Sequence, residues 1–104
     1  MIKLVGLLRR AAGTTPDAFR EHWLHHHAQI ARELPGLRRY VVNPVVAMPG
    51  GERPPWDGVA ELWFDDLAAV EAAMASPQWR AAEADHGFIE HRVIFLCDER
   101  QVLP

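Results

Sequence analysis

The stretch IKLVGLLRRAAGTTPDAFREHWLHHHAQIARELPGLRRYVVNPVV, residues 2–46, decides the fold, because it places a helix between two strands. Ile2–Arg10 is rich in aliphatic residues and is followed by small residues and glycine, which is typical of a strand that ends in a turn. Thr15 suits the N-cap of a helix, and Pro16 suits its first position. The helix is expected to run to about Leu34, where a Pro-Gly pair ends it.

The remaining sequence continues the alternation of strands and helices. The expected elements are a strand over 37–46, a loop rich in proline and glycine over 48–56, a strand over 58–64, a helix over 67–75, a short helix over 78–86 and a strand over 91–97. This order of elements is typical of an α+β, ferredoxin-like βαββαβ fold. We therefore expect residues 1–104 to form a single domain, with a four-stranded antiparallel sheet and helices on one face.

Both faces of the expected sheet carry apolar side chains, although helices can cover only one of them. In the first strand Leu4 and Leu8 point to one face, while Val5 and Leu7 point to the other. A sheet with one face in water alternates apolar and polar residues, and large exposed apolar patches are rare on monomers. The sequence therefore favours a homodimer in which a second copy covers the open face. The alternative is a partly wet face that is screened by four charged residues, Lys3, Arg9, Glu61 and Arg92.

Composition and charge narrow the class of protein. The 104 residues carry a formal net charge of −3 with histidines neutral, which provides no basic field for nucleic acid or for anionic lipid. No apolar run is long enough to cross a bilayer, and the N-terminal residues lack the pattern of a signal peptide. Cys97 is the only cysteine, so the chain cannot form an internal disulfide. We expect a cytoplasmic protein with no nucleic-acid or membrane partner.

The first helix carries four histidines, and their positions around the helix axis differ. At about 100° per residue, His27 falls within the apolar arc that includes Trp23, and His26 falls at the edge of this arc. His22 lies further from the arc, and His25 points away from it. A buried imidazole needs hydrogen-bond partners for its nitrogens. The candidate partners of His27 are Tyr40, Glu61, Asp85 and His86.

Three interpretations of this histidine cluster compete. His27 is either a core residue bonded to a backbone carbonyl or an acid or base in a pocket between helix and sheet, since imidazole titrates near neutral pH. The third interpretation is a metal site at His22 and His26, which share a helix face at i,i+4 spacing. The run EHWLHHH is not the H-E-x-x-H motif, and no third ligand follows at helical spacing, so this interpretation has the least support.

Four stretches, in order along the chain, resemble the EthD family. They are residues 19–28 with Phe19, Trp23 and His27, the PGLRRY run at 35–40, residues 56–64 and the SPQWR run at 76–80. The resemblance implies a dimeric α+β barrel with a pocket between helices and sheet, in a family that typically uses neither metal nor organic cofactor. Members of the family include proteins of ether degradation, lactone methylisomerases, and dehydratases and decarboxylases that tailor polyketides.

The resemblance also implies roles for individual residues. The helix histidine of the family falls on His27 and its strand tyrosine falls on Tyr40. His86 and the glycine after it resemble a pair that precedes the last strand in the methylisomerase branch. Cys97 lies in the expected last strand and does not match the methylisomerase cysteines. The family has a proline shortly after its helix histidine, where this chain has Gln29.

These residues predict proton transfer on a small hydrophobic carbonyl or phenolic compound, without a cofactor. We expect His27 to accept a proton, Tyr40 to donate a hydrogen bond to the developing enolate, and His86 to return a proton. Such a set suits isomerisation, dehydration, decarboxylation or cofactor-free oxygenation. The residues expected to contact the substrate are Trp23, His26, Glu61, Trp63 and Phe88. Two alternatives stay open, a pocket that binds a small molecule without turnover and a haem-degrading relative of the same fold.

Overall fold

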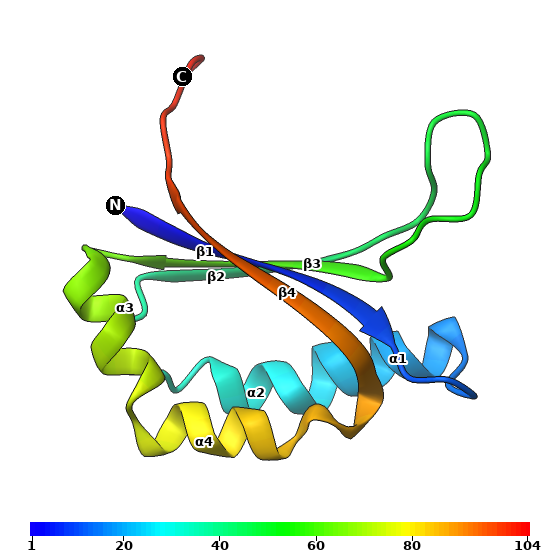
Figure 1. Cartoon of the computed structure of the whole chain (residues 1–104), viewed down its shortest axis with the longest axis horizontal. Helices are drawn as coiled ribbons and strands as arrows, with labels where there is room; N and C mark the ends of the chain where they lie inside the picture. The colour runs from blue at the N-terminus through cyan, green and yellow to red at the C-terminus, as the bar shows by residue number, and fades with distance from the viewer.

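The computed structural model describes all 104 residues and confirms the α+β ferredoxin-like fold (Figure 1). The strands are β1 (Ile2–Arg10), β2 (Arg39–Pro44), β3 (Gly58–Phe64) and β4 (Ile89–Asp98). The helical elements are α1 (Pro16–His22), the π-helical turn η1 (Trp23–His27), α2 (Ala28–Ala31), α3 (Leu67–Met74), α4 (Pro77–Ala84) and the 3-10 turn η2 (His86–Phe88). The strands form one sheet in the order β2-β3-β1-β4, and every neighbouring pair is antiparallel.

Most elements begin and end close to their expected positions. Thr15 is the N-cap of α1, where its Oγ1 accepts a hydrogen bond of 3.1 Å from the Ala18 N–H. The first helical stretch ends at Ala31 rather than Leu34. After Ala31, the N–H groups of Glu33 and Leu34 donate to carbonyls three residues back, as in a 3-10 turn, instead of four residues back. β2 is shorter than expected, whereas β4 is longer because it pairs with β1 along the whole length of that strand. No helix in the structure has the length and apolar character needed to span a membrane.

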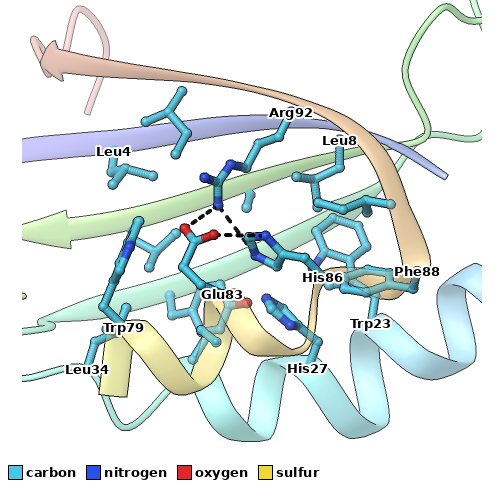
Figure 2. A pocket seen from close by; sticks show the side chains of 17 residues that line it. Leu4, Leu8, Trp23, His27, Leu34, Trp79, Glu83, His86, Phe88 and Arg92 are labelled. Atoms are coloured by element: carbon cyan, nitrogen blue, oxygen red, sulfur yellow. Dashed lines mark hydrogen bonds and ion pairs between the residues drawn. The ribbon is translucent and has the colours of Figure 1, made fainter. Parts of the chain in front are cut away.

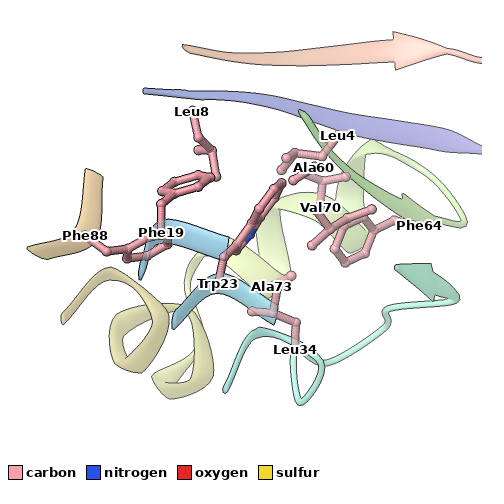
Figure 3. Packing of buried hydrophobic residues seen from close by; sticks show 11 residues of the cluster. Leu4, Leu8, Phe19, Trp23, Leu34, Ala60, Phe64, Val70, Ala73 and Phe88 are labelled. Carbon is pink, nitrogen blue, oxygen red and sulfur yellow. The ribbon is translucent and has the colours of Figure 1, made fainter. Parts of the chain in front are cut away.

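The hydrophobic core lies between the sheet and the helices, which cover one face of the sheet (Figures 1 and 3). Its largest fully buried side chains are Phe19, Trp23, Phe64 and Val70. Trp23 is 0% exposed and packs directly on β3 at Gly58. A Cβ at Gly58 would lie 2.4 Å from the indole ring, so this close approach requires a residue without a side chain.

The opposite face of the sheet has no helix over it (Figure 1). Alternation along β1 places Val5 and Leu7 on this open face, and their partners on β4 are Phe95 and Val93. Phe95 is 53% exposed in the single chain. The centre of the open face is therefore apolar, as the sequence predicts.

One charged pair lies within the open face, since Glu61 stands between Val5 of β1 and Val41 of β2, and other charged residues lie toward its ends. In this pair Lys3 Nζ lies 2.9 Å from Glu61 Oε2, and toward one end of the face the Arg9 guanidinium lies over the ring of Trp56. Arg92 was expected to help screen this face, and that expectation is wrong. It pairs in register with Leu8 and so points to the helix-covered side.

Candidate active site

A cavity of about 70 Å³ lies between the helices and the covered face of the sheet (Figure 2). Thirteen of its 17 lining residues are hydrophobic. The other four are His27, Glu83, His86 and Arg92, and Tyr40, counted among the hydrophobic residues, adds its phenol group. An apolar lining with a few polar groups is typical of a small-molecule site, although sites for drug-sized ligands have volumes of about 300–1,000 Å³. The cavity therefore suits a small molecule.

A π-helical turn positions the histidines of the first helix. In η1 the Ala28 N–H donates to the Trp23 carbonyl, five residues back, instead of four as in an α-helix. In a regular α-helix His22 and His27 would lie about 140° apart around the axis. The wider turn brings residues five apart toward the same side. As a result, His22 Nε2 and His27 Nδ1 both lie 2.9 Å from Asp85 Oδ2.

Asp85 is the hydrogen-bond partner of His27, rather than Tyr40, Glu61 or His86. Because Nδ1 faces the carboxylate, Nε2 is the free nitrogen of His27, which is 8% exposed and lines the cavity. Burial lowers the pKa of His27, and the hydrogen bond and charge of Asp85 oppose this only in part. The imidazole is therefore neutral at pH 7, and its Nε2 lone pair can accept a proton.

Asp85 also faces two further imidazoles. His22 contributes the 2.9 Å contact described above, and His26 Nδ1 lies 3.3 Å from Asp85 Oδ1. Burial by itself would raise the pKa of the Asp85 carboxyl, but the hydrogen bonds from His27, His22 and His26 together hold it below its ordinary value. Asp85 is therefore ionised at neutral pH and can anchor the His27 ring.

Tyr40 reaches the same cavity from β2. Burial raises the pKa of Tyr40 to about 12, and a hydrogen bond with Trp23 offsets part of the rise. The phenol is therefore a neutral hydrogen-bond donor at physiological pH.

The ionisation of Tyr40 can be followed directly, because it is the only tyrosine and phenolate formation changes the near-ultraviolet absorbance. We expect a spectrophotometric titration to give an apparent pKa of about 12 in the folded protein. In urea-denatured protein we expect the ordinary value of about 10. Since the folded state holds this proton more tightly, its contribution to stability is fully present below about pH 10 and is lost as the pH rises toward the folded pKa. A folded-state midpoint near the denatured value would contradict burial of the phenol.

Glu83, His86 and Arg92 form a hydrogen-bonded group along one wall of the cavity (Figure 2). Glu83 Oε2 lies 3.1 Å from His86 Nδ1, and Glu83 Oε1 lies 2.8 Å from Arg92 Nη1. Arg92 Nη1 also lies 3.4 Å from His86 Nε2. Burial lowers the pKa of His86, with Glu83 opposing this effect and Arg92 adding to it. Both nitrogens of the neutral His86 ring are therefore engaged, which makes it a less available proton donor than the sequence suggests.

The family model of the EthD domain matches residues 11–90. The chain belongs to the EthD family. A relative from Rhodococcus erythropolis, described as an uncharacterized 11.0 kDa protein in the thcB-thcC intergenic region, is 32% identical over 91 residues. These residues cover 86% of this EthD chain and 87% of the relative.

Solved structures share the fold of this EthD chain. An ethyl tert-butyl ether D (EthD) family protein from Bacillus halodurans has a TM-score of 0.81 and 27% identity, over 96% of this chain and 99% of that one. A dimeric ferredoxin-like protein of unknown function from Thermobifida fusca has a TM-score of 0.72 and 22% identity, over 92% and 88%. SnoaB, a cofactor-independent oxygenase from Streptomyces nogalater, has a TM-score of 0.68 and 21% identity, over 99% and 96%. At their level of identity the last two show a common fold alone.

The residues that sequence analysis assigned to the site of this EthD chain fall into two groups. Those that line the cavity are Trp23, His27, Tyr40, His86 and Phe88, and their roles stay predictions. His26 lies outside the cavity, where its side chain is 61% exposed beside Asp85. Glu61 and Trp63 lie on the open face of the sheet, because residues of β3 alternate and the buried Leu62 between them points to the core. This corrects the assignment of His26, Glu61 and Trp63 to the substrate pocket.

Trp63 and Glu61 have other contacts in the EthD fold. The Trp63 Nε1–H donates to the Glu99 carboxylate at 3.1 Å, and the Arg39 guanidinium lies 4.6 Å from the centroid of the indole ring. Glu61 binds Lys3, as described above. Both residues therefore have their polar partners on the open face of the sheet and not in the cavity.

Glu83 is not among the site residues predicted from the sequence, and Arg92 is predicted there for the opposite face of the sheet. Glu83 follows Trp79 by four residues, so a helical projection of α4 places both on the side that faces the sheet. Arg92 lies two residues before Ile94 on β4, so both side chains point to the same, covered face of the sheet. Both assignments could therefore have been made from periodicity alone.

Proposed function

We propose that this EthD protein catalyses proton transfer on a small hydrophobic compound that carries a carbonyl or phenol group. The observation that carries the proposal is the pairing of His27 with Asp85 beside an apolar cavity. A carboxylate that accepts from Nδ1–H fixes the ring orientation and tautomer, which leaves Nε2 as the base. The lowered pKa of His27 keeps that base unprotonated at neutral pH.

In the proposed reaction His27 Nε2 takes a proton from an acidic C–H or O–H bond of the substrate. The electron pair of that bond moves onto the conjugated oxygen, and the Tyr40 phenol donates a hydrogen bond to it. The imidazolium that forms is stabilised by the Asp85 carboxylate. Return of the proton from His27 to a different carbon completes an isomerisation with a single base. The same anion also permits loss of a β-hydroxyl group, which leaves as water with the proton that His27 has taken up. Decarboxylation of a β-keto acid gives an enolate of the same kind by loss of CO₂, and in cofactor-free oxygenation dioxygen oxidises the substrate anion.

The second candidate function is binding without turnover. The cavity is small, at about 70 Å³, and the Glu83–Arg92 pair of 2.8 Å is already satisfied without a ligand. These features also suit a protein that holds a small molecule and releases it unchanged. No observation specifically favours the haem-degrading alternative, so we do not propose it.

We also infer that a second copy of the chain covers the open face of the sheet. Val5, Leu7 and Phe95 form an apolar centre that no element of the single chain covers. Lys3 pairs with Glu61 within this face, so the carboxylate would not be an unpaired charge in such an interface. The dimeric protein of Thermobifida fusca, which has the same fold, supports this arrangement.

Exchange of substrate protons with deuterium tests the proposed chemistry without knowledge of the product. The protein is incubated in D₂O with anthrone-type phenols, cyclic ketones and muconolactones, and exchange is followed by NMR. We expect the wild type to accelerate exchange in at least one class, and His27→Gln to reduce this acceleration about 10²–10⁴-fold. His25→Ala is the matched control, since the His25 side chain is 68% exposed and points away from the cavity.

The outcomes of this experiment separate the two candidate functions. Exchange that is as fast in His27→Gln as in the wild type would refute His27 as the base. Saturable binding of a compound, seen as quenching of tryptophan fluorescence, without exchange in any class would favour binding without turnover. Circular dichroism of each variant establishes that the fold is retained.

A further inference from the structure

Two histidines that the proposed reaction does not use converge with Asp85 at the surface beside η1. His22 Nε2 lies 2.9 Å from Asp85 Oδ2, and His26 Nδ1 lies 3.3 Å from Asp85 Oδ1. The ring centroids of His22 and His26 are 4.6 Å apart. The nearest donor atoms of the three residues all lie within 4.8 Å of one another. The i,i+4 pair found in the sequence thus has a third potential ligand, which comes from the turn after α4.

Ordinary ion pairing accounts poorly for this arrangement. The His26 side chain is 61% exposed, and ion pairs at such positions contribute little to stability. A single carboxylate contact is enough to orient His27, yet Asp85 faces three imidazoles. Neutral imidazoles together with a carboxylate are, however, a ligand set that divalent transition ions bind well.

We propose that His22, His26 and Asp85 bind a divalent transition-metal ion, for which Zn²⁺ is the best-suited probe. Two imidazole nitrogens and one carboxylate oxygen leave the fourth tetrahedral position to water. With bonds of about 2.0–2.1 Å, neighbouring donor atoms around tetrahedral zinc lie about 3.4 Å apart. The two contacts to Asp85, of 2.9 Å and 3.3 Å, are already close to this separation, and all three donor atoms lie within 4.8 Å of one another. Side-chain rotations that bring the two imidazoles closer together would complete the site.

The ion site lies outside the cavity and shares Asp85 with it. His27 Nδ1 contacts the same oxygen, Asp85 Oδ2, that faces His22. His27 is therefore hydrogen-bonded to a ligand of the proposed ion, and such a partner orients a metal-binding carboxylate. Ion binding needs no occupant in the cavity, so it can be tested independently of the proposed reaction.

Isothermal titration calorimetry of tag-free protein with ZnCl₂ tests the proposal. We expect one ion per chain in the wild type, and we expect His22→Ala and His26→Ala each to weaken binding by about tenfold or more. His25→Ala is the matched control, because His25 lies on the same turn and contacts only Glu21, at 3.8 Å. This control is expected to bind Zn²⁺ like the wild type.

Substitution of Co²⁺ provides a second readout, since the visible absorption of Co²⁺ reports tetrahedral nitrogen and oxygen ligands. We expect these bands in the wild type and in His25→Ala but not in His26→Ala, a surface change that leaves the fold intact by circular dichroism. The proposal is overturned if the wild type binds no ion below millimolar concentration. It is equally overturned if His22→Ala or His26→Ala binds like the wild type, or if His25→Ala loses binding as well.

Discussion

Gly58→Ala is expected to lower the free energy of unfolding by about 3 kcal/mol, at the upper end of the range for overpacked cores. The added Cβ would lie 2.4 Å from Trp23 Cζ3 and 2.6 Å from Cη2. Trp23 is 0% exposed and packed in the core, so its ring can move away from the added Cβ only by displacing its neighbours or by entering the cavity that it lines. For a domain of this size the loss corresponds to a fall in Tm of roughly 10–20 °C. Urea unfolding followed by tryptophan fluorescence and circular dichroism measures the effect.

Gly6→Ala is the matched control for this prediction. Gly6 lies on the neighbouring strand β1 and points to the same covered face, but an added Cβ would lie 3.8 Å from the Cβ of Ala60, an ordinary contact. We expect it to be neutral or to stabilise the fold by about 0.4–1 kcal/mol, because alanine restricts the unfolded chain. Equal destabilisation by both substitutions would show that strand glycines matter here for a reason other than contact with Trp23.

The order of elements could be predicted from the sequence because its local signals agree with one another. Ile2–Arg10 has the composition of a strand, Thr15 and Pro16 mark a helix start, and the Pro-Gly pair after Leu34 marks its end. Helical periodicity also placed His27 among the core residues, where the structure has it 8% exposed. These features depend on neighbours within a few positions along the chain.

The arrangement of the site could not be predicted in the same way, because it depends on a departure from regular helix geometry. The π turn of η1 rotates His22 toward the side of His27, whereas the regular projection separates them. Asp85, which joins them, lies 58 residues further along the chain than His27. Contacts at such separations are set by how α4 packs against α2, and no periodicity encodes that packing.

The misplacement of Glu61 and Trp63 has a different origin. Glu61 and Trp63 lie two and four residues after Val59 on β3. Because successive side chains of a strand point to opposite faces, all three lie on the open face of the sheet. A carboxylate and an indole among apolar strand neighbours are suited to a pocket, but this pattern does not tell which face of the sheet carries the pocket. In this chain the alternation of side chains along β3 indicates their face of the sheet more reliably than their chemical type does.

Phe95→Glu is expected to convert the proposed dimer into a monomer. Phe95 is 53% exposed in the single chain and lies at the apolar centre of the open face, opposite Val5. A carboxylate buried there without a partner costs several kcal/mol, so the dimer Kd is expected to rise at least about a hundredfold. Sedimentation at micromolar concentration is expected to give twice the 11.8 kDa chain mass for the wild type and 11.8 kDa for the variant.

Leu67→Glu is the matched control, because Leu67 is also 53% exposed but lies at the start of α3 rather than on the open face. An acidic residue in the first turn of a helix is well tolerated, so this variant is expected to fold and to stay dimeric. If general loss of surface hydrophobicity drove dissociation, Leu67→Glu and Phe95→Glu would dissociate alike. A wild type that sediments only as an 11.8 kDa species would overturn the dimer itself. The apolar centre around Val5 would then face water, a rare arrangement that would call for another partner on that face.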